Sequence, residues 1–192
     1  MLSAIIATQE SERTLVPTLT ALVPAAATGF LAAVVVTDAG SRDGTAEIAE
    51  VAGCRFMTSA QPLGARLKIA AASTRSPWLM FLRAGAIPQA GWIEVAERFI
   101  KKTDMLKGAA CAAVFRPPAP SDYLRPRLAE IAWLLRAALG GCPKAEQGLL
   151  IARRFYDSIG GHSADADAEA ALLRRLGRRR LVMLPVTVSE TG

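Results

Sequence analysis

Several polar side chains able to bind a ligand follow a strongly apolar stretch of the chain. The β-branched run at 34–36 is followed by Asp38, Ser41 and Asp43 in a glycine-containing turn, and an apolar helix pattern begins after that turn. Ligands of open α/β sheets bind at the carboxyl ends of the strands. The carboxylate of Asp38 can there accept two hydrogen bonds from a ribose diol or one from a base N–H, and we expect Asp38 and Ser41 to belong to a ligand-binding site. Ser41 or Asp43 could instead cap the next helix, and capping is the favoured role for Asp43.

A second cluster of candidate residues is cationic. Gly64 precedes a predicted helix over 64–73 that carries Arg66 and Lys68. A helix N-terminus with cations beside it suits the binding of a diphosphate. The alternative is a surface helix with ordinary charges.

The hydrophobic pattern predicts the strands and helices that position these candidate residues. Strands are predicted at 3–7, 31–37, 54–58, 78–82, 108–116, 148–152 and 180–188. Helices are predicted after Ser11, which can cap the first of them, and at 43–52, 64–73, 91–101, 123–139 and 164–177. Strands that alternate with helices predict an α/β fold with a mainly parallel sheet and helices on both faces. The length fits a single domain over 1–192, which the proline loop at 117–120 divides into 1–116 and 121–192.

The composition narrows the classes of partner and of site. A net charge of +6 favours an anionic partner, but the basic residues are not interleaved with aromatic ones, so no nucleic acid is expected. Three distant cysteines fit neither a disulfide framework nor a zinc site. His162 is the only histidine, which excludes multi-histidine metal sites, and we expect it to be a loop residue. The N-terminus does not resemble a signal peptide and no apolar run reaches about 18 residues, so a cytoplasmic location is expected.

Three segments, in order along the chain, resemble glycosyltransferases of family 2. Residues 38–45 resemble the element Asp-Asp/Gly-Gly-Ser-x-Asp-Gly-Thr, and residues 64–92 match the family at Arg66, Phe81, Leu82, Pro88 and Trp92. Residues 146–162 resemble Asp-Gln-Gly-x-Phe-x-Arg-Arg…Phe…Gly-Gly-Phe from one bacterial branch. The resemblance implies a GT-A (nucleotide-diphospho-sugar transferase) fold. It implies an inverting transfer of sugar from a nucleotide-diphosphate donor to an acceptor, with Asp38 at the nucleoside, a nucleotide-binding half at 1–116 and an acceptor-side half at 121–192.

One departure from the family concerns its metal-binding acid. The Asp-x-Asp triplet aligns with Arg83-Ala84-Gly85, in which Arg83 and Gly85 offer no side-chain oxygen to a hard cation. No metal ligand is therefore assigned, and Arg83, Arg66 or Lys68 is expected to neutralise the leaving diphosphate in place of a metal. The alternative is a non-catalytic nucleotide-binding or scaffold paralogue on the same fold.

The bacterial branch also has a Glu-Asp pair whose aspartate deprotonates the acceptor hydroxyl. Ungapped alignment puts Asp165 at the glutamate and Ala166 at the aspartate, and a slip of one residue makes Asp165 or Asp167 the expected base. Alternatively, Asp165, Asp167 and Glu169 only form the favourable acidic first turn of a basic helix.

The helix expected at 123–139 has an apolar stripe bordered by arginines. Such a helix can lie on a membrane, which would give a lipid-linked acceptor and a peripheral location at the inner membrane face. Packing on the sheet or against a second copy, which would give a homodimer, is the favoured alternative.

Overall fold

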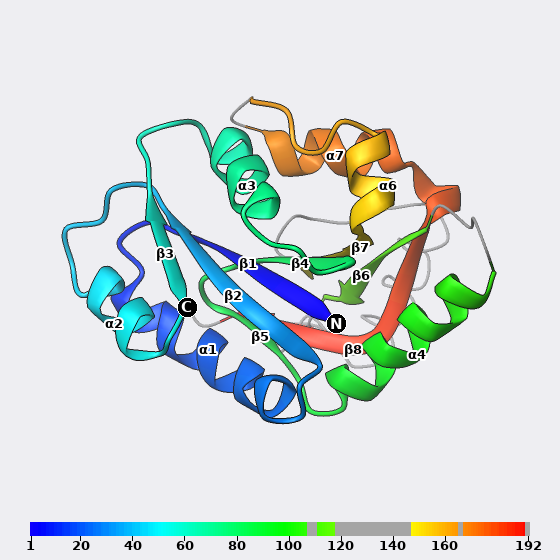
Figure 1. Ribbon diagram of the computed structural model, residues 1–192, viewed down its shortest axis with the longest axis horizontal. Helices are drawn as coiled ribbons and strands as arrows, with labels where there is room; N and C mark the ends of the chain where they lie inside the picture. Colours follow the sequence, from blue (N-terminus) through cyan, green and yellow to red (C-terminus); the bar gives the residue numbers. More distant parts are fainter. Residues whose placement is uncertain (107–110, 118–146, 165–166, 191–192) are drawn as a thin grey trace, which may run out of the picture.

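The computed structural model describes residues 1–106, 111–117, 147–164 and 167–190. These residues form an eight-stranded sheet in the order β3-β2-β1-β4-β7-β6-β8-β5 (Figure 1). The strands are β1 (Leu2–Thr8), β2 (Leu31–Asp38), β3 (Arg55–Thr58), β4 (Trp78–Arg83), β5 (Ala86–Pro88), β6 (Ala112–Arg116), β7 (Leu149–Ala152) and β8 (Leu181–Glu190). The α-helices are α1 (Glu12–Ala27), α2 (Thr45–Val51), α3 (Leu63–Ala72), α4 (Trp92–Met105), α6 (Arg153–Ser158) and α7 (Ala168–Leu176), and a 3-10 turn spans Arg178–Arg180.

The sheet is mixed, so the expectation of a mainly parallel sheet was wrong. Strands β3, β2, β1 and β4 are parallel to one another, as are β6 and β8. The pairs β4–β7, β6–β7 and β5–β8 are antiparallel. The physical reason is that a buried strand has the same apolar pattern in either direction, so the pattern predicts burial but not orientation.

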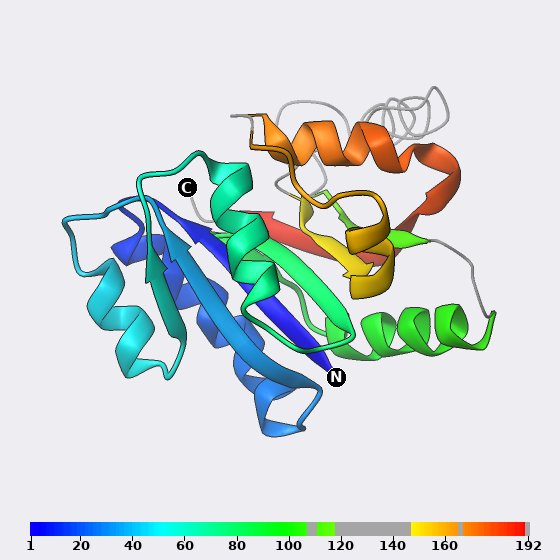
Figure 2. The same cartoon turned by 45° about the horizontal axis from the view of Figure 1, so that its top comes forward.

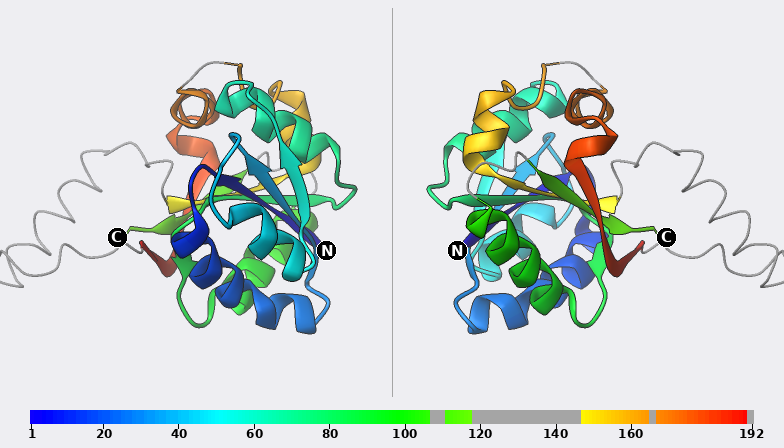
Figure 3. Two further views of the ribbon diagram at one scale, coloured as in Figure 1. Left: turned by 90° about the vertical axis from the view of Figure 1, so that its left-hand side faces the viewer. Right: turned by 90° about the vertical axis from the view of Figure 1, so that its right-hand side faces the viewer.

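Helices cover both faces of the sheet, as expected. Helices α1, α2 and α4 lie on one face, and α3, α6 and α7 lie on the other (Figure 3). Each face has its own hydrophobic core. The alternation of side chains along β1 explains this, because Leu2, Ala4 and Ile6 join the first core and Ile5 and Ala7 join the second.

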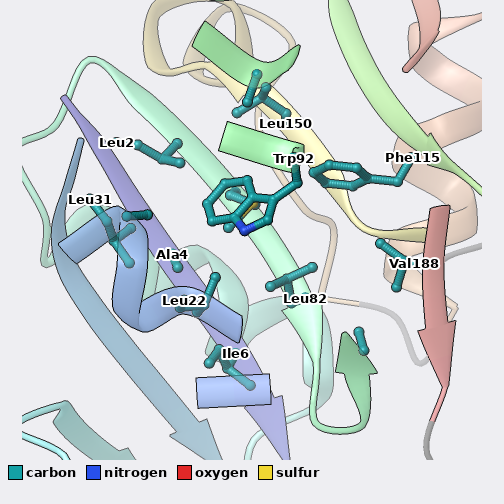
Figure 4. Close-up of a cluster of buried hydrophobic side chains, with 14 of the residues drawn as sticks. Leu2, Ala4, Ile6, Leu22, Leu31, Leu82, Trp92, Phe115, Leu150 and Val188 are labelled. Atoms are coloured by element: carbon teal, nitrogen blue, oxygen red, sulfur yellow. The ribbon is translucent and has the colours of Figure 1, made fainter. Parts of the chain in front are cut away.

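The core beneath α1 and α4 is anchored by Trp92 (Figure 4). Its indole Nε1–H donates a hydrogen bond to the carbonyl of Ala21 at 3.1 Å, so the buried polar atom is satisfied. Leu82 at the end of β4 belongs to the same core. Packing on this face therefore fixes the strand ends that carry the candidate residues.

Some elements differ from the sequence expectation. The three-residue β5 and the six-residue α6 were not predicted, because such short elements carry too few residues for a periodic pattern. Helix α7 begins at Ala168 rather than at 164. Ser11 precedes α1, but its hydroxyl bonds the backbone of Gln9 and does not cap the helix.

Parts of the prediction fall outside the described residues. These are the helix at 123–139 with its lipid-linked acceptor and homodimer, the proline loop from 118, Cys142 and Asp165. Among the described helices, none has the length and apolar character needed to cross a membrane.

Candidate functional site

The candidate residues lie where four parallel strands end. The register pairs Thr8 with Asp38, Asp38 with Thr58, and Ala7 with Arg83, so the carboxyl ends of β1 to β4 share one edge of the sheet. Neighbouring strands are about 4.8 Å apart, which separates the ends of β2 and β4 by roughly 10 Å. This edge is where open α/β sheets bind ligands.

Asp38 ends β2 with only 1% of its surface exposed. One carboxylate oxygen accepts hydrogen bonds from the hydroxyls of Thr8 and Ser41, at 2.8 and 2.6 Å. The other accepts the backbone N–H groups of Gly40 and Ser41, at 2.7 and 2.6 Å. Burial alone would raise the pKa of the Asp38 carboxyl, but these hydrogen bonds outweigh it and the pKa lies below its usual value. Asp38 is therefore ionised and holds its own loop together.

The loop after β2 is tied to the loop after β1. The Ser41 hydroxyl accepts the N–H of Glu10 at 2.7 Å, and the Glu10 carboxylate accepts the N–H of Arg42 at 2.9 Å. The Asp43 carboxylate accepts the N–H groups of Glu12 and Thr45, the first residues of α1 and α2, at 3.0 and 3.1 Å. Asp43 thus serves the starts of two helices, where a capping role at one was expected. The sequence pattern did not indicate that this network includes Thr8, Glu10 and Glu12.

Arg66 projects from α3 toward the end of β2 and is 7% exposed. Its Nη1 donates a hydrogen bond to the carbonyl of Thr37 at 2.8 Å, while its buried Nε has no hydrogen-bond partner among the described residues. Burial lowers the pKa of the Arg66 guanidinium, and the charge of Asp38 opposes that shift. Lys68, two residues later, is exposed on another side of the helix, so the structure does not bring it beside Arg66.

Gly64 lets the start of α3 approach the start of α7. A Cβ at Gly64 would lie 1.7 Å from the carbonyl oxygen of Ser163 and 2.4 Å from the Cβ of Ala168. Only glycine fits this contact without a shift of backbone. Figure 2 shows α3 and the start of α7 side by side on one face of the sheet.

Arg83 ends β4 and forms an ion pair with Glu169 from the first turn of α7. The guanidinium donates from Nε to Oε2 of Glu169 at 2.9 Å, and its Nη2 contacts the same oxygen. The Arg83 side chain is 44% exposed and that of Glu169 is 11% exposed. Sequence reasoning singled out Arg83 but did not connect it with Glu169, because 86 residues separate them and no local pattern relates the two.

His162, in the loop after α6, lies near Glu169 and is 2% exposed. Its Nδ1 and the hydroxyl of Tyr156 are 2.8 Å apart, and its ring packs edge-on against Phe81. Burial, helped by the charge of Arg175, lowers the pKa of His162 to about 4. His162 and Glu169 line the same cavity of about 10 Å³, which is close to the smallest that holds one water molecule.

The candidate bases lie near the start of α7. Asp167 directly precedes the helix, and its carboxylate, 71% exposed, accepts hydrogen bonds from Arg174 on the same helix at 3.3 Å. The structure therefore does not bring its side chain together with Asp38 or Arg83. Asp165 lies outside the described residues.

The residues at the end of β4 do not fit a divalent cation. Arg83 is a cation, and Gly85 contributes its N–H to the hydroxyl of Thr18 at 2.9 Å and to the carbonyl of Thr14 at 3.0 Å. In the part of the chain that the structure describes, no three His, Cys, Asp or Glu side chains form a group able to hold a metal. A hard cation needs several oxygen ligands, and this strand end does not supply them.

The chain is similar to one known protein family and to several solved structures. The model of the family described as Glycosyl transferase family 2 matches residues 3–175. No curated protein matches the sequence. Among solved structures, glucosyl-3-phosphoglycerate synthase from Mycobacterium tuberculosis, in complex with Mn²⁺, UDP and glucosyl-3-phosphoglycerate, has 19% identity and a TM-score of 0.68, covering 100% of this chain and 72% of that one.

Two further structures give similar values. The same synthase with Mn²⁺ and UDP-glucose has 20% identity and a TM-score of 0.67, covering 100% of this chain and 71% of that one. A structure described as a mycobacterial protein has 19% identity and a TM-score of 0.71, covering 100% of this chain and 67% of the other. At these identities the likeness shows the fold alone, which is of the expected α/β GT-A type, although its sheet is mixed and not mainly parallel as expected.

Proposed function

Because the chain belongs to glycosyltransferase family 2, we propose that it transfers a sugar from a nucleotide-diphosphate donor to an acceptor, with inversion at the anomeric carbon. The observation that carries this proposal is the edge of the sheet at which Asp38, Ser41, Arg66 and Arg83 are placed. The synthase structures were solved with UDP or UDP-glucose, which makes uridine nucleotides the first donors to test.

In this proposal the candidate residues divide between two parts of the donor. The loop of Asp38 and Ser41 contacts the nucleoside, and Arg66 and Arg83 neutralise the diphosphate. The buried Nε of Arg66, for which the described residues offer no hydrogen-bond partner, supports its part, because an anionic ligand oxygen would satisfy it. Lys68 was expected to share this task, but its exposed position gives that expectation no support.

The transfer itself is a direct displacement. The acceptor hydroxyl oxygen bonds to the anomeric carbon as the bond from that carbon to the diphosphate oxygen breaks. The proton of the hydroxyl goes to a carboxylate, for which Asp165 and Asp167 are the proposed groups, and the charge on the leaving diphosphate is stabilised by the arginines. Asp167 would have to leave Arg174 to serve. No divalent metal takes part in this scheme.

A second candidate function is nucleotide binding without catalysis. The Arg83-Ala84-Gly85 sequence in place of the family's acid triplet and the pairing of Asp167 with Arg174 both favour it. The release of a nucleoside diphosphate distinguishes the two functions, because only a transferase breaks the bond between the sugar and the diphosphate of its donor.

A panel of nucleoside diphosphates and nucleotide sugars, with and without Mn²⁺, tests the proposal. We expect at least one to raise the melting temperature without Mn²⁺, and that nucleotide sugar to be consumed when the acceptor is supplied. Asp165→Asn or Asp167→Asn should abolish transfer and keep nucleotide binding, with Glu97→Gln as the control. If no nucleotide changes the melting temperature, the binding claim fails. Binding without release of nucleoside diphosphate selects the second candidate.

A further inference from the structure

The Arg83–Glu169 ion pair stands at the strand end where the family resemblance places an acid. Two nitrogens of the Arg83 guanidinium contact one oxygen of Glu169. The planar fork of a guanidinium suits the oxygens of a phosphate as well as those of a carboxylate. Glu169 therefore takes up a position on Arg83 that a phosphate oxygen can also take.

The two partners differ in their access to solvent. The Arg83 side chain is 44% exposed, whereas that of Glu169 is 11% exposed and lines the small cavity beside His162 and Phe81. An anion from solution can reach the guanidinium directly. An ion pair with one partner this exposed is weak, so a ligand with higher negative charge can replace the carboxylate.

The position of Glu169 also keeps the free-energy cost of its release from Arg83 small. Glu169 lies in the first turn of α7, where the N-terminus of a helix stabilises negative charge. The neighbouring imidazole of His162 is neutral at neutral pH, because burial lowers its pKa to about 4, so it does not hold the carboxylate in place by charge. Glu169 can therefore remain ionised when Arg83 turns to another anion.

We propose that Glu169 is an internal counter-ion of Arg83 and that the diphosphate of the donor displaces it. Glu169 is then a positioning residue that holds Arg83 at the end of β4. Because it competes with the donor for Arg83, it also lowers the affinity of the protein for the donor. That the displacing diphosphate belongs to a nucleotide donor rests on the proposed function. The exchange itself requires only an anion with phosphate chemistry.

Calorimetric titration with UDP and with inorganic pyrophosphate, in buffer containing EDTA, tests the exchange. Glu169→Gln keeps the size of the side chain but removes its charge, and should tighten binding of both ligands about fivefold. Arg83→Gln should weaken binding at least about tenfold. Glu97→Gln, which breaks the exposed ion pair with Lys101 on α4, is the matched control and should leave the affinities unchanged.

A double variant separates exchange from a merely structural role. In the Arg83→Gln background, Glu169→Gln should have no further effect, because Glu169 acts through Arg83. If Glu169 only held α7 in place, Glu169→Gln alone would weaken binding, which would overturn the exchange. Equal affinities of wild type and Glu169→Gln would overturn it too.

The two ligands separate this inference from the proposed function. A pyrophosphate response to both variants, with no binding of UDP or any other nucleotide, would keep the exchange and overturn the nucleotide-sugar proposal. UDP binding that ignores Glu169 would overturn only the exchange. Binding of neither ligand to any variant would overturn both.

Discussion

The ends of β2 and β4 lie at one edge of the sheet, yet their charged side chains are held in opposite ways. Asp38 is buried and its two carboxylate oxygens accept four hydrogen bonds, three of them from Gly40 and Ser41. Arg83 is half exposed and is paired with a residue 86 positions away. A group bonded so fully within its own loop builds the loop, whereas an exposed pair between distant elements can exchange a partner. The loop at the end of β2 is therefore held rigid, whereas the cation at the end of β4 can exchange its partner for a ligand.

The largest loss of stability should come from disrupting the hydrogen bonds of Asp38 at the end of β2. Asp38→Asn replaces carboxylate acceptors with an amide that faces backbone and hydroxyl donors, so several hydrogen bonds are lost in a buried place. We expect the free energy of unfolding at pH 7 to fall by about 3–4 kcal/mol in denaturant titrations. Asp43→Asn, in the same loop but at its exposed side, should cost clearly less. A loss below about 1 kcal/mol for Asp38→Asn would mean that the network does not hold the loop.

This contrast also explains what the sequence could predict. The partners of Asp38 are mostly within three residues, so a turn motif after an apolar strand was enough to select Asp38 and Ser41. Glu169 resembled any acid in the first turn of a helix, and only the path of the chain from β7 through α6 brings it to Arg83. The same limit applies to the fold. Local periodicity located the strands, but the antiparallel insertion of β7 between β4 and β6 depends on the whole chain.

The stability contributions of His162 and Asp38 should depend on pH in different ranges. His162 is buried and neutral with its pKa lowered to about 4, so the unfolded chain binds more protons between pH 6.5 and 4. Stability should fall across this window as the pH falls, by on the order of 3 kcal/mol. The depressed pKa of Asp38 acts lower, because its contribution is kept above the unfolded value of 3.8 and is lost below it.

The measurement is a series of denaturant titrations from pH 7 to 4 on the wild type and on His162→Asn. The asparagine amide can still reach Tyr156 but does not titrate. We expect the wild type to lose more stability than the variant over this window. Parallel curves would show that His162 is protonated as easily in the folded chain as in the unfolded one.

The close contact of Gly64 with Ser163 holds the start of α7 near the end of β4. Gly64→Ala places a Cβ against the carbonyl of Ser163, which cannot move without shifting the backbone. We expect a loss of about 2 kcal/mol in the free energy of unfolding. Gly53→Ala is a poor control because the φ of Gly53 is positive, so Ala65→Gly, next in the helix, gives the propensity reference. A neutral Gly64→Ala variant would mean that α3 and α7 are less closely apposed.

The smallest effect on stability should come from a change at the end of β4. Arg83→Gln removes an ion pair in which the cation is 44% exposed, and such pairs contribute about 0–1 kcal/mol. The charge of Glu169 remains favourable in the first turn of α7, so its loss of a partner costs little. The free energy of unfolding should therefore change by less than about 1 kcal/mol, although the affinity for a diphosphate falls. A loss as large as that of Asp38→Asn would contradict this, because it would make Arg83 part of the scaffold. The two strand ends would then share one role, and the cation at the end of β4 would not be free to change partners.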